Sequence, residues 1–276
     1  MNTQNSILLI DPAFDTNTSL NCCLLLKMGI DSFSYAILDK EANKIIAVFD
    51  QQECEDVSNI LSERLKNDAY LGLTFNEIKL SIYTENNISI PNSLYDSDNL
   101  KLVSKFFTQP YSENLYTTTH PNFGFTSVFS FSKITDEIIN QSFANSKKYE
   151  PNALLLKLAE NIPDTSLLLD FTAGSIHVLF IKNKQVVLHK CYETATAEEF
   201  NYYILLIINQ LAINLNETPV YICGIIHDGD EKYNSLKQYF SAVQFLNFVD
   251  FNLDQQVLED MPSHYYTSLL ALDQCV

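Results

Sequence analysis

The chain has 276 residues, of which 34 are Asp or Glu and 17 are Lys or Arg, so its formal net charge is −17. This length suits one large domain or two domains of ordinary size. A hydrophobic fraction of 46% is typical of a globular protein and excludes a disordered acidic chain. The negative charge disfavours nucleic acid as a partner, because the phosphate backbone would repel it. Arg64 is the only arginine, which excludes an Arg cluster for phosphate or carboxylate recognition.

The N-terminal part of the chain begins with a polar segment. Residues 1–19 are rich in Asp, Asn and Thr, and we expect them to form a flexible lead-in. Apolar residues at helical spacing over 53–67 predict an amphipathic helix. Between these segments, three short apolar runs predict three strands joined by tight turns, at 20–27, 33–38 and 44–50.

The middle of the chain carries weaker patterns. Alternation and β-branched residues predict strands at 78–84, 89–94 and 126–134. Helical spacing and capping residues predict helices at 96–107, 135–145 and 152–161. Residues 108–125 are rich in Tyr, Thr, Asn and Pro, and we expect a loop there. Its aromatic side chains either pack within the loop and the core or, where they are exposed, suit contact with a protein partner.

After Pro163 the order of elements starts again. Strands are predicted at 166–170, 176–181 and 185–192, a helix at 196–214, a strand at 219–226, a helix at 231–240, a strand at 243–248 and a helix at 264–272. Each half therefore has three strands and a helix, followed by alternating strands and helices, although residue identity between the halves is low. We expect two lobes, 20–163 and 164–276, each a mixed sheet flanked by helices, that face each other over a cleft.

This arrangement resembles the actin-like ATPase superfamily, whose members contain two ribonuclease H-like modules. The residues that carry the resemblance are 167–175, Leu-Leu-Leu-Asp-Phe-Thr-Ala-Gly-Ser, and the strand 176–181 that follows. In that superfamily the second half opens with an apolar strand, an Asp and a glycine-containing turn before a second strand. The Tyr and Leu residues of 265–272 are also similar to a family of uncharacterised bacterial proteins with this fold. The resemblance covers nearly the whole chain from residue 20.

The resemblance implies a nucleotide site in which two hairpin turns wrap phosphates with backbone N–H groups, an approach that requires glycine. The residues at the matching positions are Gly29, Asp31, Asp170, Thr172, Gly174, Ser175 and Gly224. The chain has only six glycines, and Thr172 and Ala173 replace the usual glycine pair. Lys27 occupies the strand position where the superfamily has an acid. We therefore expect degenerate phosphate turns, with no cofactor, and ATP and Mg²⁺ as disfavoured ligands.

Other sites have little support in the sequence. The five histidines lack the spacing of a zinc site, and no Gly-Lys-Ser/Thr phosphate loop or Gly-x-Ser-x-Gly motif occurs. His177 and His189 fall in adjacent predicted strands and are expected to be neighbours. The six cysteines show no metal-binding spacing, no run reaches the roughly 18 apolar residues of a membrane span, and no signal-peptide core is present. We expect a cytoplasmic protein with no membrane partner.

Three functions remain open from the sequence. The favoured one is a catalytically degenerate actin-like protein that acts by binding another, unidentified protein. The second is an ATPase or small-molecule kinase in which Asp170 arranges Mg²⁺ and Asp31 assists, which requires a nucleotide-sized cleft between Gly29 and Gly174. The third is a structural subunit that forms a homodimer or filament, which requires a self-complementary apolar surface.

Overall fold

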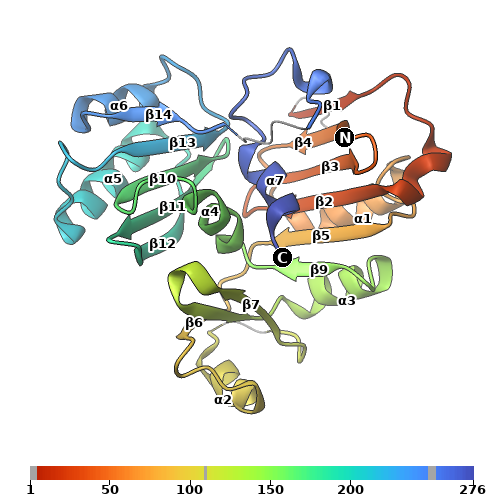
Figure 1. The fold of residues 1–276 in the computed structure, drawn as a ribbon, viewed down its shortest axis with the longest axis horizontal. Coiled ribbons are helices and arrows are strands. Elements are labelled where there is room, and N and C mark those ends of the chain that lie inside the picture. The colour runs from red at the N-terminus through yellow and green to blue at the C-terminus, as the bar shows by residue number, and fades with distance from the viewer. Residues whose placement is uncertain (1–4, 109–110, 248–252) are drawn as a thin grey trace.

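The computed structural model describes residues 5–108, 111–247 and 253–276. Two lobes, each built on one sheet, lie side by side, and a small three-stranded domain projects from the first lobe (Figure 1). The chain therefore has the predicted α/β architecture of two mixed sheets flanked by helices.

The first lobe is a six-stranded sheet of order β1-β4-β3-β2-β5-β9. Its strands are β1 (Ser6–Ile10), β2 (Cys22–Met28), β3 (Phe33–Asp39), β4 (Lys44–Gln51), β5 (Glu77–Ile82) and β9 (Lys147–Tyr149). Strands β2, β3 and β4 form an antiparallel meander, and β5 and β9 continue the sheet in parallel. Helices α1 (Val57–Asn67) and α3 (Lys133–Ser142) bury Leu61 and Ile139 against one face of this sheet.

The second lobe repeats this order as β12-β11-β10-β13-β14. Its strands are β10 (Ser166–Phe171), β11 (Ser175–Lys182), β12 (Gln185–Glu193), β13 (Val220–Gly224) and β14 (Val243–Phe245). Helices α5 (Ala197–Leu211) and α6 (Glu231–Tyr239) cover its outer face, where Phe200 and Leu236 are buried. A capping box between Thr196 and Glu199 fixes the start of α5. Strands β10 to β14 thus correspond to β2, β3, β4, β5 and β9.

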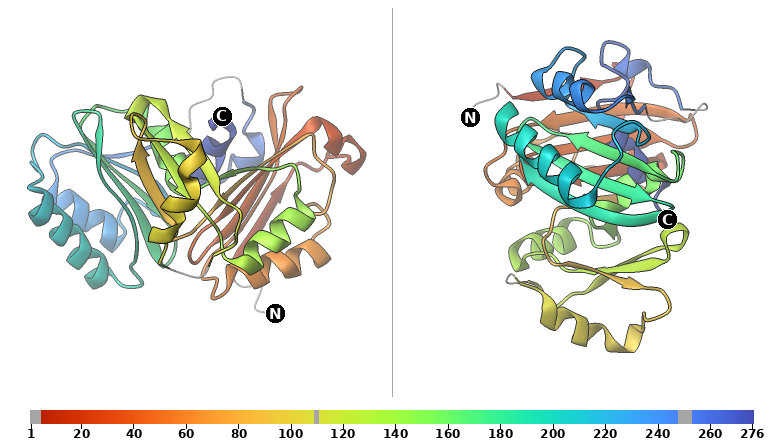
Figure 2. Two further views of the ribbon diagram at one scale, coloured as in Figure 1. Left: turned by 90° about the horizontal axis from the view of Figure 1, so that it is seen from below. Right: turned by 90° about the vertical axis from the view of Figure 1, so that its left-hand side faces the viewer.

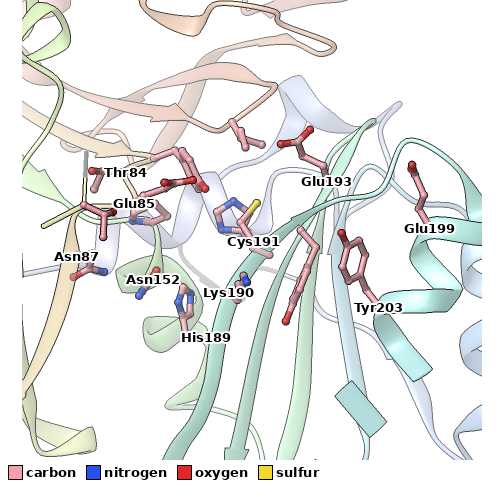
Figure 3. A pocket seen from close by; sticks show the side chains of 16 residues that line it. Thr84, Glu85, Asn87, Asn152, His189, Lys190, Cys191, Glu193, Glu199 and Tyr203 are labelled. Carbon is pink, nitrogen blue, oxygen red and sulfur yellow. The ribbon is translucent and has the colours of Figure 1, made fainter. Parts of the chain in front are cut away.

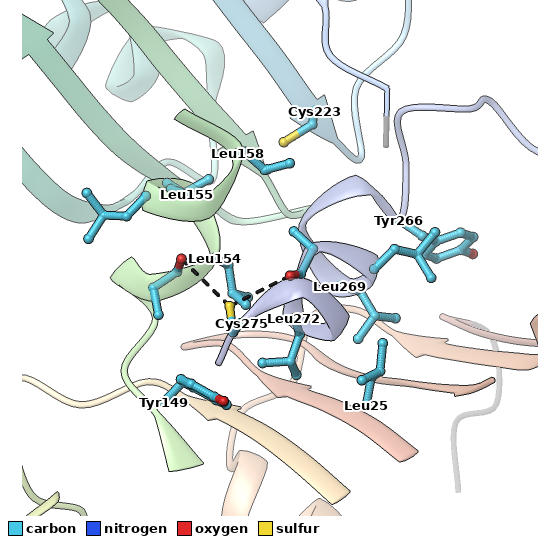
Figure 4. Packing of buried hydrophobic residues seen from close by; sticks show 14 of the residues in the cluster. Leu25, Tyr149, Leu154, Leu155, Leu158, Cys223, Tyr266, Leu269, Leu272 and Cys275 are labelled. Atoms are coloured by element: carbon cyan, nitrogen blue, oxygen red, sulfur yellow. Dashed lines mark hydrogen bonds between the residues drawn. The ribbon is translucent and has the colours of Figure 1, made fainter. Parts of the chain in front are cut away.

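The two lobes share one hydrophobic core around helices α4 (Asn152–Ala159) and α7 (Thr267–Ala271). Both helices lie between the sheets, and their leucines interdigitate (Figure 4). The same cluster contains Leu25 of the first sheet and Leu168 of the second. Each fully buried leucine contributes about 1.5–3 kcal/mol, so this core fixes one lobe against the other.

The small domain consists of strands β6 (Asn87–Pro91), β7 (Tyr116–His120) and β8 (Phe125–Phe129), all antiparallel, and the short helix α2 (Leu100–Val103). Figure 2 shows it extending away from the two sheets. Its base is fixed by Asp136, whose carboxylate accepts hydrogen bonds from the Ser112 and Tyr116 hydroxyl groups at 2.6 Å each.

The structure corrects several expected boundaries. Residues 6–10 are not a flexible lead-in, because this short apolar run pairs with β4 as strand β1, and a 3₁₀ helix (Thr16–Asn21) follows. Residues 1–4 lie outside the described residues. Within the expected loop 108–125, the β-branched Thr-Thr-Thr run forms β7, and residues 109–110 are not described. The strand expected at 126–134 ends at Phe129, and α3 begins after its N-cap Ser132. Strand β14 ends at Phe245, and position 248 of the expected strand is not described.

Candidate functional site: the junction of the two hairpin turns

The turn between β2 and β3 meets the turn between β10 and β11 where the lobes face each other. Asp31 of the first turn reaches across this junction. Its carboxylate accepts hydrogen bonds from Thr172 Oγ1 at 2.9 Å, from the Gly174 N–H at 3.0 Å and from Ser175 Oγ at 3.0 Å. An internal carboxylate thus bonds the turn that the resemblance implied for phosphate.

The backbone donors of the second turn are all used within the protein. The Ala173 N–H donates to Gln52 Oε1 at 3.0 Å. The Thr172 N–H donates to the Ser175 carbonyl, and the Ser175 N–H donates to Thr172 Oγ1. With Gly174 bonded to Asp31, no N–H group from 172 to 175 is left free for a phosphate oxygen.

Lys27 and Asp170 form a buried ion pair beside the two turns. Lys27 Nζ lies 2.6 Å from Asp170 Oδ2 and 2.7 Å from Ser268 Oγ, and the Asp170 side chain is 3% exposed. Burial alone would lower the pKa of Lys27 and raise the pKa of Asp170. Their mutual attraction outweighs burial, so the pKa of Lys27 is raised and that of Asp170 is lowered. Both groups are therefore charged, and the Lys27 ammonium binds the carboxylate that the resemblance implied for Mg²⁺.

Two of the predicted glycines serve close contacts between protein atoms. Gly224 has φ +85°, and a Cβ there would lie 2.1 Å from the Phe171 carbonyl oxygen and 2.8 Å from Asp170 Oδ1. The Gly29 N–H donates to the Ser32 carbonyl at 2.8 Å, and a Cβ there would lie 2.4 Å from Ser32 Oγ. Both glycines let the chain turn tightly. All predicted site residues thus lie at this junction: Gly29, Asp31, Asp170, Thr172, Gly174, Ser175 and Gly224.

The space left at the junction is small. The cavity between the two turns, the end of β13 and residues 265–269 has a volume of about 20 Å³. Such a volume holds about one water molecule, whereas small-molecule sites occupy about 300–1,000 Å³. Asp50 lines this cavity, and burial raises its pKa to about 6 against the opposing effects of Gln52 and Lys27.

A much larger cavity opens beside the junction, and we call it the interlobe groove. Asp170, His177 and Cys191 lie opposite one another on β10, β11 and β12, and the groove begins at His177, one strand beyond the ion pair. It has a volume of about 850 Å³ and runs between β12 and the β5–β6 connection (Figure 3). Its walls include Thr84, Glu85, Asn87, His177, residues 189–193 and Glu199.

The histidines of the groove are neutral. His177 and His189 both line it, and burial lowers the pKa of His177 to about 4 and that of His189 to about 3. Burial also raises the pKa of the Cys191 thiol to about 12, so this cysteine is not a thiolate nucleophile. Within residues 5–108, 111–247 and 253–276, no group of three or more His, Cys, Asp or Glu side chains is arranged to hold a metal ion.

The sequence profile of a family described as "Protein of unknown function (DUF3822)" matches residues 11–243. The chain belongs to this family. No curated protein sequence matches it.

Solved structures show what fold this DUF3822 protein has. It is similar to a Bacteroides thetaiotaomicron VPI-5482 protein with an actin-like ATPase fold and unknown function, with a TM-score of 0.74, 16% identity and coverage of 95% of this chain and 99% of that one. A chain of the PilM-PilN type IV pilus biogenesis complex gives a TM-score of 0.56 at 10% identity, over 91% and 97% of the two chains. The ethanolamine utilization protein EutJ from Carboxydothermus hydrogenoformans gives 0.51 at 8% identity, over 97% and 93%. The predicted actin-like ATPase fold is therefore confirmed.

Sequence reasoning missed several residues of the junction in this DUF3822 protein. Lys27 is recognisable in the sequence as a charge at the end of an apolar strand, but its bond to Asp170 spans 143 positions. Asp50 is the last residue of the third predicted strand and Gln52 lies just beyond it. Nothing in their local pattern indicates that Asp50 lines the small cavity or that Gln52 reaches the second turn. None of the helices in the described parts of the chain combines the length and the apolar character that crossing a bilayer requires.

Proposed function

We propose that this DUF3822 protein is a non-catalytic actin-like protein that acts by binding another protein. The observation that carries the proposal is the Asp31 carboxylate, which accepts the hydrogen bonds of Thr172, Gly174 and Ser175 in the second turn. A triphosphate would have to displace this carboxylate and compete with an anion that is already tethered in place.

The ion pair and the small cavity support the same proposal. Separating Lys27 from Asp170 would leave a buried carboxylate without its counter-charge, which costs about 3–5 kcal/mol. Opening a nucleotide site would further require enlarging a cavity of about 20 Å³. These costs would be subtracted from any binding free energy of ATP. We therefore disfavour the ATPase or kinase alternative.

Two features favour a protein partner. Leu94, Leu102 and Phe106, on the small domain, are 74%, 52% and 77% exposed. Exposed apolar side chains that lie close in sequence are typical of protein contact surfaces. The fold is compatible with such a role, since one structural relative was solved as the PilM-PilN type IV pilus biogenesis complex.

We place the protein in the cytoplasm in this proposal, because all six cysteines are free thiols.

Calorimetric titration with ATP and Mg²⁺ tests this proposal. We expect no saturable binding at concentrations up to about 1 mM, and no phosphate release. A dissociation constant below about 10 µM, with hydrolysis that is lost in a folded Asp170→Asn variant, would overturn the proposal. Light scattering over a concentration series separates it from the structural-subunit alternative, for which the mass would rise with concentration.

A further inference from the structure

Strand β12 has a free edge that faces the interlobe groove. Among the described residues it is the outermost strand of the second sheet and has nine residues, whereas the opposite edge strand, β14, has three. Five consecutive residues, 189–193, line the groove. Because successive side chains of a strand point to opposite faces, such a continuous run means that the groove follows the edge of the strand (Figure 3).

The ladder indicates which backbone groups point into the groove. The Thr194 N–H donates to the Gly174 carbonyl at 2.7 Å, so this pair is hydrogen-bonded. In an antiparallel ladder bonded and non-bonded pairs alternate. The N–H and C=O groups of Glu193, Cys191 and His189 therefore point away from β11. Unpaired groups of this kind are a template for a further strand.

The first lobe shows how the equivalent edge is used. Strand β4 corresponds to β12, and β1 pairs with it as an antiparallel strand over 47–51. Gln51 lies across from Phe33, which in turn pairs with Met28 at the end of β2. Tyr192 lies across from Ile176, which pairs with Phe171 at the end of β10, so 47–51 corresponds to 188–192. In both lobes this stretch directly follows the bulge in the strand. Of the stretch in the second lobe that corresponds to the one covered by β1, residues 189–192 line the groove.

The charges of the groove favour a basic ligand. Its walls include the carboxylates of Glu85, Glu193 and Glu199, against one ammonium, that of Lys190. The Lys190 ammonium also lies over the Tyr192 ring, at 5.2 Å from its centre. Two further wall residues, Asn87 and His189, have buried polar atoms without a hydrogen-bond partner in the described parts of the chain, Oδ1 and Nε2 respectively. The groove therefore offers acceptors and negative charge beside the free edge.

We propose that the free edge of β12 binds an extended, basic segment of a partner protein as an additional antiparallel strand. This inference rests on the proposed function and names the surface that carries it. The added strand would occupy the place that β1 has in the first lobe, with its backbone paired to His189, Cys191 and Glu193. Its basic side chains would meet Glu193 and Glu199 on one wall and Glu85 on the other, so the segment would contact both lobes.

A displayed library of random decapeptides, selected on the full chain, tests the proposal. We expect the selected peptides to be basic and extended, with backbone N-methylation at alternate residues abolishing their binding. In hydrogen exchange, a bound peptide should protect the amides of Cys191 and Glu193. A library without binders, or peptides that protect other surfaces and not β12, would overturn the proposal.

Two variants at one position separate backbone pairing from side-chain contacts. Cys191→Pro removes an outward N–H from an edge strand, a position where proline is tolerated, and Cys191→Val removes the same thiol but keeps the N–H. We expect Cys191→Val to bind the selected peptides within about twofold of the natural chain, and Cys191→Pro to bind them at least about tenfold more weakly. Equal affinities of the two variants would refute strand addition. A dimer in light scattering that Cys191→Pro abolishes and Cys191→Val keeps would refute the basic partner, because a second copy of the chain would then occupy the edge. Nucleotide titration is a separate measurement, so failure of the proposed function is distinguishable from failure of this inference.

Discussion

The two neighbouring cavities at the lobe junction differ greatly in volume. The one between the hairpin turns holds about 20 Å³, and the interlobe groove, one strand further along the same sheet face, holds about 850 Å³. The difference lies in the side chains that cross from the first lobe. Asp31 reaches the second turn and accepts its hydrogen bonds, and Lys27 reaches Asp170 and forms an ion pair with it. Beside β12 only Ile30 of the first turn lines the wall, and the backbone edge stays open.

This contrast teaches that two lobes joined at their hairpin turns need not leave an empty cleft between those turns. The same duplicated fold keeps its hairpin turns but uses their hydrogen-bonding groups to join the lobes. The larger space lies beside the edge of the second sheet and not between the turns. Substitutions at the junction of the two hairpin turns measure how much its contacts contribute to the stability of the fold.

Removing the ammonium of the buried ion pair should have the largest effect. Lys27→Met leaves the Asp170 carboxylate buried without its counter-charge, and we expect a loss of about 3–5 kcal/mol in the free energy of unfolding by urea titration. The double variant Lys27→Met with Asp170→Leu removes both charges and should recover more than half of that loss. A Lys27→Met variant as stable as the natural chain would show that the junction is not held by this pair.

Asp50 should make the stability of the protein depend on pH. Its pKa is about 6 in the folded protein and 3.8 in the reference state, so between these values the folded state binds more protons than the unfolded state. The natural chain should therefore lose stability relative to Asp50→Asn as the pH rises from about 4 to 7, by about 3 kcal/mol at most. Urea titrations of both proteins across this range measure the difference, and parallel pH profiles would contradict it.

Substitution of Gly224 should disrupt the contact between the end of β13 and the second turn. A Cβ would lie 2.1 Å from the Phe171 carbonyl oxygen, so the backbone must shift. Gly229 is a matched control, because its φ of +98° is also positive but no described atom beyond its chain neighbours lies within 4 Å of the position that a Cβ would take. We expect Gly224→Ala to lower the thermal midpoint more than Gly229→Ala, by an amount equivalent to about 2 kcal/mol. Equal shifts would mean that this contact adjusts without cost.

The carboxylate that crosses between the turns should contribute least to stability. Asp31→Ala leaves the Gly174 N–H without an acceptor, and we expect a loss of about 1–2 kcal/mol because the site is only partly buried. Asp31→Asn keeps one acceptor oxygen and should cost less than half as much in the same urea titration. Equal losses in the two variants, which both remove the negative charge, would show that the charge and not the hydrogen bond matters here.

Most of the fold could be predicted because it follows from the spacing of apolar residues within each element. The meander of β2, β3 and β4, the crossover helix α1 and their repetition after Pro163 all follow from periodicity and turn residues. Strand β1 was missed because the four-residue apolar run Ile7–Ile10 has no visible partner in a polar segment, and β4 supplies that partner only in three dimensions. Strand β7 was missed because polar Thr residues conceal its β propensity.

The site residues could be located from the resemblance, but their interactions could not. Asp31 and Gly174 were both predicted at the junction, yet the bond between them joins residues 143 positions apart. Spacing reports on neighbours along one element and says nothing about which side chain crosses between lobes. The free edge of β12 was equally invisible, because strand order in a sheet is a property of the folded chain.

Helix α7 has a consequence for how the chain folds during synthesis. It packs on β2 and β3 of the first lobe, and Lys79 of β5 donates hydrogen bonds to the backbone carbonyls of Asp273 and Cys275. Translation proceeds from the N-terminus at about 5–20 residues per second, so Leu25 and its neighbours stay uncovered until residues 266–275 leave the ribosome. A nascent first lobe therefore exposes an aggregation-prone apolar face for many seconds. A chaperone that covers this face would improve the yield of native protein.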